Sequence, residues 1–411
     1  MLCPFPSGFK GGGEIPPEKQ EPGDRIQERG AKELGTEEPG CGDNARALDD
    51  FSVAVEYHLA MAAIAASPRL VPEREPGWIY KASWDLPLLI LSAILVPLPF
   101  LVAWAAEATG WMRPDKVIDL INITVAALIG GPHLFSTITY TFLDGGFRRS
   151  HPRYAMLAFL LPACVIYLGI NHYRLLITFF FGWASLHVLH QIIYLSDCYR
   201  ARSGMRDPRW SRMVDYGLIL TGLYPTGLYK LSLREFRVGG VIPPYPDWLE
   251  RFHLPEAAGI VFGAFLLVWL GKTYREFRMR RGSLPKTLLI AITTVVSFCL
   301  PLGKNLDVLF QGYNTWHSFQ YLFLLWLLNR LRLERGEIDS PLVESLVRRN
   351  TMTAYYLCFL AATGVLVLLT VIVRALTSLS ADQSYFVVVL SVLLMHYYFD
   401  HFLFTQPQML E

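Results

Sequence analysis

The stretch WASLHVLHQIIYLSDCY, from Trp183 to Tyr199, places two histidines three residues apart inside a long apolar segment. A segment crosses a bilayer when about 20 of its consecutive residues are mostly apolar. Ionisable side chains at membrane depth are costly, tend to face the interior of a helical bundle, and mark functional sites. The stretch therefore predicts a membrane-spanning helix that carries imidazoles for a functional reason.

The composition of the 411-residue chain agrees with a membrane protein. Hydrophobic residues make up 53% and charged residues 18% of the chain, and the mean hydropathy is +0.32. Soluble domains carry about 25% charged residues, so the charge content is low for a soluble protein. The six cysteines form no C-x-x-C pair, which argues against a disulfide framework and against a zinc ribbon.

The first fifty residues differ in composition from the rest of the chain. They are rich in Gly, Pro and Glu and almost free of large apolar residues, so residues 1–50 are predicted to be a disordered tail. Residues 51–85 are expected to hold an interfacial helix, over 51–67, and a linker. Residues 86–404 are expected to form the membrane bundle, and residues 405–411 a short C-terminal tail.

The predicted fold class is all-α, a polytopic bundle of about ten transmembrane helices. Four prolines, Pro97, Pro99, Pro225 and Pro301, are expected to interrupt spans. The expected spans are 86–108, 117–142, 154–170, 174–198, 212–230, 255–271, 286–303, 306–331, 352–375 and 384–404.

Basic residues alternate between the loops that join these spans. The loops after the second, fourth, sixth and eighth spans are rich in Arg and Lys, as in DGGFRRSHPR and KTYREFRMRRGSLPK. The positive-inside rule then places these loops and both termini in the cytoplasm. We expect a multi-pass protein of a bacterial inner (plasma) membrane, and because topology accounts for the basic residues, we expect no nucleic-acid partner.

Six of the ten histidines fall inside expected spans, and four of the spans carry polar stripes. His133 and Thr137 share one face of their span, and His396 and Asp400 share another, because residues four apart lie on one side of a helix. His401, five residues after His396, points elsewhere. The remaining histidines, His58, His151, His172 and His253, are interpreted as ordinary loop or interfacial residues.

The stripes lie at similar depth, since the even-numbered spans run in one direction and their histidines fall near or past the middle. Imidazole is the commonest nitrogen ligand of transition metals in proteins, and ligation would offset the cost of burying these rings. The predicted metal ligands are His133, His187, His190, His317, His396 and Asp400.

The absence of paired thiolates disfavours a structural zinc site. Three to five nitrogens with a carboxylate suit non-haem iron, mononuclear or dinuclear. Copper, and haem with axial histidines, are alternatives. Tyr194 and Tyr321 are expected to act near bound oxygen as sources of protons or hydrogen bonds. Asp197 is expected to act in catalysis or to orient a ligand.

The GGPH motif ending at His133, the paired histidines of the fourth span and the late histidines resemble the bacterial β-carotene-cleaving oxygenases of the Brp/Blh type. That resemblance implies a multi-span protein with histidine-ligated iron. It covers scattered motifs, and Leu134 stands where that family continues with glycine. HVLHQ is also similar to the histidine boxes of membrane desaturases and hydroxylases, but Gln191 stands where a last histidine is expected.

Three classes of function follow from these features. The favoured one is a membrane metal-dependent oxygenase, hydroxylase or desaturase that acts on a lipid or isoprenoid and takes electrons from a soluble donor. The second is an ion or small-molecule transporter whose path is lined by the polar stripes. The third is a scaffold in which the stripes only join helices. The sequence gives neither the substrate, the metal nor the oligomeric state.

Overall fold

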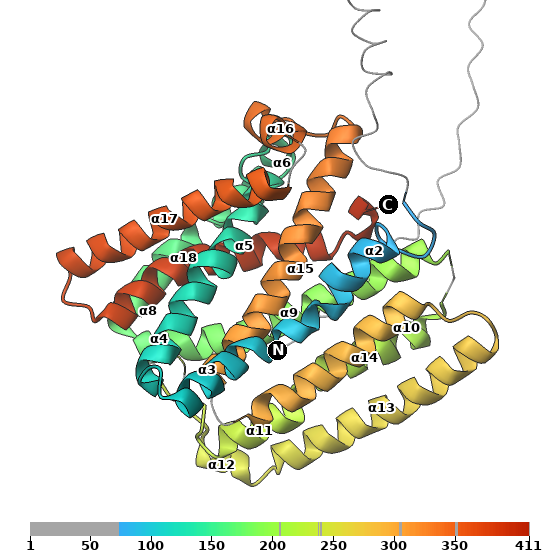
Figure 1. Cartoon of the computed structure of the whole chain (residues 1–411), viewed down its shortest axis with the longest axis horizontal. Coiled ribbons are helices and arrows are strands. Elements are labelled where there is room, and N and C mark those ends of the chain that lie inside the picture. Colours follow the sequence, from blue (N-terminus) through green and yellow to red (C-terminus); the bar gives the residue numbers. More distant parts are fainter. Residues whose placement is uncertain are drawn as a thin grey trace, which may run out of the picture. The chain divides into compact units, whose positions relative to one another are not determined.

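The computed structural model describes residues 74–204, 207–236, 238, 241–303, 306–349 and 352–410. Among these residues the structure is helical, and its β structure is limited to one isolated bridge between Val238 and Val241. The expected tail over 1–50 and the expected interfacial helix over 51–67 lie outside the described residues. The prediction of an all-α bundle is confirmed (Figure 1).

The described helices, several of them interrupted by π or 3-10 turns labelled η, follow one another along the chain. They are α2 (Ala82–Asp85), η1 (Leu86–Ile90), η2 (Leu91–Leu95), α3 (Leu98–Thr109), α4 (Pro114–Val125), η3 (Ala126–Gly130), α5 (Gly131–Ser136), η4 (Thr137–Thr139), α6 (Gly145–Ser150), α7 (Pro152–Leu157), α8 (Leu160–Asn171), α9 (Tyr173–Arg202), α10 (Arg209–Thr221), α11 (Tyr224–Ser232), α12 (Asp247–Glu250), α13 (Leu254–Arg278), α14 (Leu284–Cys299), η5 (Leu300–Leu302), α15 (Leu306–Glu334), α16 (Pro341–Arg348), α17 (Met352–Leu376), α18 (Ala381–Phe404) and η6 (Pro407–Leu410).

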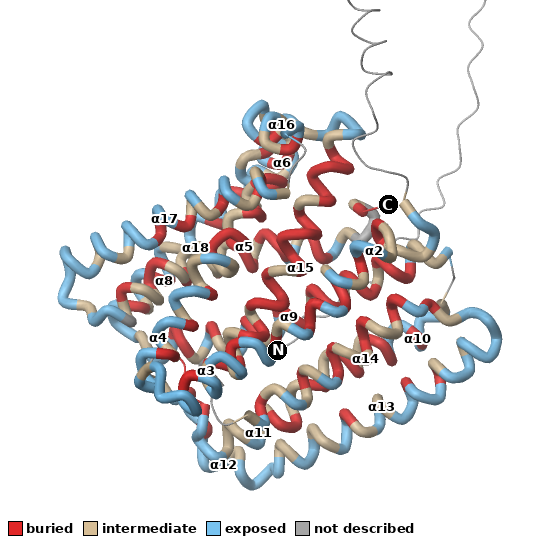
Figure 2. The backbone as a smooth tube through the Cα atoms, viewed as in Figure 1, coloured by how far each residue is buried: buried red, intermediate tan, exposed pale blue. Residues whose placement is uncertain are grey.

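Eight helical segments of the described chain are long and apolar enough to cross a membrane. Their exposure supports that role, because only 11% of the apolar window of α13 and 17% of that of α17 are buried. Figure 2 shows these two helices exposed along most of their length. The eight segments are Ala82–Thr109, Pro114–Thr139, Pro152–Asn171, Tyr173–Arg202, Leu254–Arg278, Leu284–Leu302, Met352–Leu376 and Gln383–Phe404.

Large apolar side chains cover the outside of these segments. Ile94, Ile260 and Leu376 are each more than 70% exposed, at 78%, 74% and 80%. Contiguous apolar surface of this extent is a liability in water and marks an interface with another molecule or with lipid. Together with the long apolar helices, this surface makes the chain a membrane protein.

Two of the ten expected spans differ from these eight segments. The span expected over 212–230 is divided into α10 and α11, which are separated at Gly222 and Leu223. Pro225 follows this break and lacks the N–H that would continue the helix. The span expected over 306–331 falls within α15, which carries many polar residues.

Helix α15 lies at the centre of the bundle, where it contacts α3, α4, α5, α16 and α17. Figure 2 shows it buried over most of its length, and Trp316, Tyr321 and Phe323 are fully buried. Gly312 allows a close approach of another backbone: a Cβ atom there would lie 1.9 Å from the carbonyl oxygen of Val96, directly after η2. The polar face of α15 is thereby surrounded by protein rather than lipid.

Candidate metal centre

Four histidines from four different helical segments meet inside the bundle. They are His133 on α5, His187 on α9, His317 on α15 and His396 on α18, and we call them the histidine cluster. Each offers one ring nitrogen, and these four nitrogens all lie within 4.8 Å of one another. Each of the four residues is at most 5% exposed.

The rings of the cluster pack edge to face. The ring centroid of His133 lies 4.7 Å from that of His317 and 4.3 Å from that of His396. The centroid of His187 lies 5.1 Å from that of His317 and 5.3 Å from that of His396. Residues up to 263 positions apart along the chain, from His133 to His396, are thus in contact at one point of the bundle.

Most ring nitrogens of the cluster lack a hydrogen-bond partner among the described residues. These buried atoms are Nδ1 of His133, Nε2 of His187, both ring nitrogens of His317 and Nε2 of His396. An unsatisfied buried polar group costs about 1–3 kcal/mol, and such groups are rare in native proteins. The lone pairs of four converging imidazoles fit a bound transition-metal ion, which would replace the missing partners.

Asp400 adds a carboxylate to the edge of the cluster. Its Oδ1 accepts hydrogen bonds from the hydroxyl groups of Tyr321 and Thr137, the latter at 3.1 Å. Its Oδ2 makes no hydrogen bond to a described residue and lies 3.3 Å from Nε2 of His396 and 3.6 Å from Nε2 of His187. One oxygen is therefore held in place while the other faces the imidazoles.

Thr137 links His396 to the other polar groups at the edge of the cluster. Its Oγ1 lies 2.5 Å from Nδ1 of His396, 2.7 Å from the hydroxyl of Tyr321 and 3.1 Å from Oδ1 of Asp400. The contact to Nδ1 leaves Nε2 of His396 directed at the cluster. With its proton on Nδ1, donated to the threonine oxygen, His396 would present the Nε2 lone pair that a metal ligand requires.

Local helix geometry brings His133 into the cluster. The π-helical turn η3 comes directly before the segment Gly131–Ser136, and single π turns are frequent at functional sites. Gly131 packs against α17 so closely that a Cβ atom would lie 2.2 Å from Cγ2 of Thr363. Gly131 of the GGPH motif thus permits close helix packing two residues before the histidine.

His190 lies outside the histidine cluster. Its ring centroid is 5.7 Å from that of His401 and 5.3 Å from that of Phe404, and it is only partly buried. Three residues along an α-helix turn a side chain by 300°, so His190 faces about 60° away from His187. His401, which is exposed, lies beside it, and His58 is outside the described residues.

The three expected catalytic residues occupy different surroundings. Tyr321 contacts the cluster, with its ring centroid 4.6 Å from that of His133. Tyr194 is buried but is separated from the cluster by Phe404. The ring centroid of Phe404 lies 5.3 Å from that of Tyr194 and 5.6 Å from that of His187. Asp197 accepts hydrogen bonds from Arg200, Arg212 and Tyr216 and belongs to a separate group of charges.

This separate group, the charged cluster, joins α9, α10, α13 and α14. Asp215 is fully buried and accepts hydrogen bonds from Arg200 at 2.7 Å, from Trp269 at 3.1 Å and from Lys272. Four acidic and four basic residues balance one another in the charged cluster. They are Asp197, Arg200, Asp207, Arg212, Asp215, Lys272, Glu276 and Lys286.

Asp207 lies in the loop between α9 and α10 and has a perturbed pKa. Burial opposes ionisation of its carboxyl, but Lys286 and Arg200 each donate a hydrogen bond to it at 3.0 Å. Their hydrogen bonds and positive charges outweigh the burial and hold the pKa of Asp207 below its usual range. Asp207 therefore stays ionised, and its two partners connect the loop before α10 to α9 and α14.

Two residues at the histidine cluster were not expected as site residues. Thr137 orients both Asp400 and His396, and its spacing of four from His133 was the signal that could have identified it. Tyr397 stacks on His187, with ring centroids 3.9 Å apart. No sequence pattern points to that contact, because Tyr397 directly follows His396 and neighbouring residues face different directions.

Comparison of the chain with protein-family models, with curated proteins and with solved structures returned no match. The resemblance to the carotenoid-cleaving oxygenases therefore rests on the quoted motifs alone.

Proposed function

We propose that this chain is an integral membrane enzyme with a mononuclear non-haem iron centre, an oxygenase, hydroxylase or desaturase acting on a lipid or isoprenoid. The observation that carries the proposal is the convergence of one nitrogen from each of four distant histidines within 4.8 Å. His133, His187, His317 and His396 would hold the ion. Asp400 would supply a carboxylate from the same side as His187 and His396.

The spacing of the ligand atoms favours a single ion. With metal–nitrogen bonds of about 2.1 Å, opposite ligands stand roughly 4.2 Å apart, close to the spread of the four nitrogens. Two ions about 3.5–4 Å apart would need more ligands than four imidazoles and one carboxylate. A haem is disfavoured because its four pyrrole nitrogens would need the positions that the imidazoles already fill.

The donor set favours iron over the other candidate metals. Imidazole with a carboxylate suits Fe, and imidazole alone also suits Cu and Zn, whereas thiolates would favour Zn or Cu(I). The group of four contains no cysteine, and Cys198 is not part of it. Copper is the competing metal, and elemental analysis distinguishes it from iron.

A bound iron ion would supply the activation of dioxygen that oxidation of an unreactive carbon chain requires. The protein residues would keep the site dry, since all four histidines and Asp400 are buried. Tyr321 and Thr137 would hold Asp400 in one orientation through its Oδ1. An apolar substrate would reach this interior from the bilayer that surrounds the exposed helices.

The topology belongs to the same proposal. With ten spans, counting the broken helix over α10 and α11 and the central α15, the arginine-rich loops and both termini lie in the cytoplasm of a bacterial inner membrane. Hydroxylation and desaturation need two electrons besides dioxygen, and a soluble donor would deliver them from the cytoplasmic side. Oxidative cleavage by a dioxygenase needs no such donor.

The test is isotope labelling with the iron-loaded protein in nanodiscs made from native lipid extract. Under ¹⁸O₂, an oxygenase or hydroxylase adds labelled oxygen to a lipid, and a desaturase lowers the lipid mass by two hydrogens. A chemical reductant stands in for the donor, and the His396→Gln variant serves as the inactive control. If the folded, iron-loaded protein left both the lipid and the isoprenoid fractions unchanged, the proposal of an oxidative enzyme would be contradicted.

Tyr321 offers a test of how Asp400 is held. Tyr321→Phe removes one of the two hydroxyl donors to Oδ1, so we expect iron affinity to fall about 10–100-fold, as for other partners that orient metal ligands. The matched control is Tyr313→Phe on the same helix, which removes a buried hydroxyl bonded to Ser297 at 3.0 Å. Chelator competition measures both affinities, and equal losses in the two variants would contradict the role of Tyr321.

A further inference from the structure

A second candidate site lies where α10 begins and α13 ends. A cavity of about 600 Å³ opens there. It is lined by the first turn of α10, including Trp210, and by the last turns of α13 with the loop that follows, including Arg275 and Arg281. Its inner wall is formed by members of the charged cluster.

The charges on the inner wall are already compensated. Lys272 pairs with Asp215 and lies 3.6 Å from Glu276, and Asp207 pairs with Arg200 and Lys286 at 3.0 Å. These pairs leave no net charge available to a ligand. The wall is polar but neutral.

Two positive charges remain at the mouth of the cavity. Arg275 and Arg281 are exposed, and neither side chain pairs with a carboxylate in the described part of the chain. The 13-residue helix α10 begins at the same place without a side-chain cap, and a helix start carries a partial positive charge. The uncompensated field at the mouth therefore attracts an anion.

The position of the cavity in the bundle indicates where that anion comes from. The loop after Arg278 joins α13 to α14, and both helices belong to the candidate membrane spans. Trp210 is 52% exposed and Met279 is 46% exposed, and tryptophan is enriched where a bilayer meets water. If α13 and α14 span the bilayer, Arg275 and Arg281 lie at the level of the lipid phosphate groups.

We propose that this cavity binds the phosphate group of an anionic ligand, with Arg275 and Arg281 as the charges that hold it. Basic pockets between membrane helices bind anionic headgroups by this chemistry, and arginine suits phosphate because its planar fork offers paired donors. The position at the span ends favours an anionic phospholipid as the source of the phosphate.

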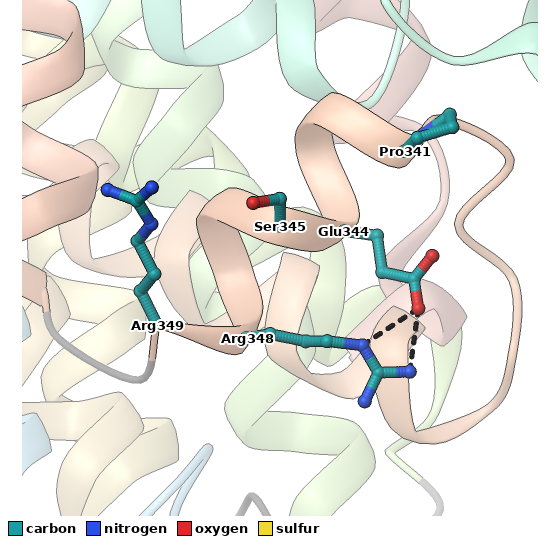
Figure 3. A pocket seen from close by; sticks show the side chains of 5 residues that line it. All are labelled: Pro341, Glu344, Ser345, Arg348 and Arg349. Carbon is teal, nitrogen blue, oxygen red and sulfur yellow. Dashed lines mark hydrogen bonds and ion pairs between the residues drawn. The ribbon is translucent and has the colours of Figure 1, made fainter.

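The hollow beside α16 lacks these features. It is lined by Pro341, Glu344, Ser345, Arg348 and Arg349, all from one short helix and the residue after it. Figure 3 shows the guanidinium of Arg348 bonded to Glu344 and Arg349 directed away from them. One arginine there is neutralised, and no second element completes a binding site.

The test compares lipid binding by the full-length protein and the double variant Arg275→Gln/Arg281→Gln. Native mass spectrometry in detergent measures the dissociation constants of phosphatidylglycerol and of zwitterionic phosphatidylcholine. We expect the dissociation constant for phosphatidylglycerol to rise about 25-fold in the double variant, at about fivefold for each arginine near the surface. The constant for phosphatidylcholine should stay the same.

Arg278→Gln is the matched control, because Arg278 lies on the same helix, bonds to Tyr274 at 3.3 Å and does not line the cavity. Its lipid binding should stay within twofold of the wild type. Inorganic phosphate that displaces phosphatidylglycerol at millimolar concentration would assign the cavity to a soluble phosphate compound instead of a lipid. Equal phosphatidylglycerol binding by the wild type and the double variant would overturn the site.

Discussion

Replacing His187 by alanine is expected to reduce bound iron from about one equivalent per chain to below a tenth. The substitution removes one of four convergent nitrogens. Losing a ligand should lower the iron affinity by more than the roughly 10–100-fold that follows from losing a partner that only orients a ligand. His190→Ala is the matched control, because it removes the same side chain three residues later on α9, outside the histidine cluster. Elemental analysis of the two purified variants measures the difference.

The stability of the metal-free protein adds a second readout to this comparison. Nε2 of His187 has no hydrogen-bond partner among the described residues, so removing the imidazole relieves a buried unsatisfied atom while it opens a small cavity. We expect the metal-free variant to unfold within a few degrees of the metal-free wild type. If His187→Ala and His190→Ala retained equal amounts of iron, the proposed metal site would be refuted, and His187 would have a purely structural role.

Replacing Asp215 by alanine is expected to destabilise the protein by about 3–5 kcal/mol, the usual cost of breaking a buried ion pair from one side. Asp215 is fully buried, and its removal leaves the buried Lys272 without its main partner. The midpoint of thermal unfolding in detergent should fall by about 10 °C. The iron content of the variant should be unchanged at temperatures below the transition, because the charged cluster and the histidine cluster are separate.

Two further variants distinguish the loss of charge balance from the loss of packing. Asp119→Ala breaks an exposed pair with Lys116 and should cost at most about 1 kcal/mol. Adding Lys272→Met to Asp215→Ala should recover part of the lost stability, because it removes the unpaired ammonium. A double variant less stable than Asp215→Ala alone would show that the stabilisation does not depend on charge balance.

The sequence predicts most of the histidine cluster because its signal is local to each helix. Apolar length identifies the spans, and the spacing of four identifies the shared face of His396 and Asp400. The similar depth predicted for these spans indicated one cluster, and His133, His187, His317 and His396 do lie together in the structure. These features depend only on the period of the helix and the thickness of the bilayer, so they can be recognised in the sequence of each span by itself.

The remaining parts depend on rotation and on contacts between helices. His190 is one turn from His187 but rotated away, and Asp197 pairs with Arg200 and Arg212 instead of reaching the histidines. The stacking of Tyr397 on His187 depends on how α18 is rotated against α9. Helix rotation is set by packing over the whole interface, and spacing within a single helix does not determine it.

The π-helical turn at Ala126–Gly130 has a consequence for how the centre can be dissected. A π turn closes over one residue more than the α turn it replaces, and each residue of an α-helix contributes about 100° of rotation. Because the wider turn accommodates that extra residue, the helix on either side keeps nearly the same rotation, and deleting one residue from 126–130 should restore a regular helix with His133 still directed at its partners. Inserting a second residue there would exceed what one π turn accommodates and rotate His133 by about 100°, although every side chain of the histidine cluster would still be present. A deletion and insertion scan through residues 126–130 would therefore test the rotation of His133 separately from the identity of its neighbours, which substitution scanning does not do.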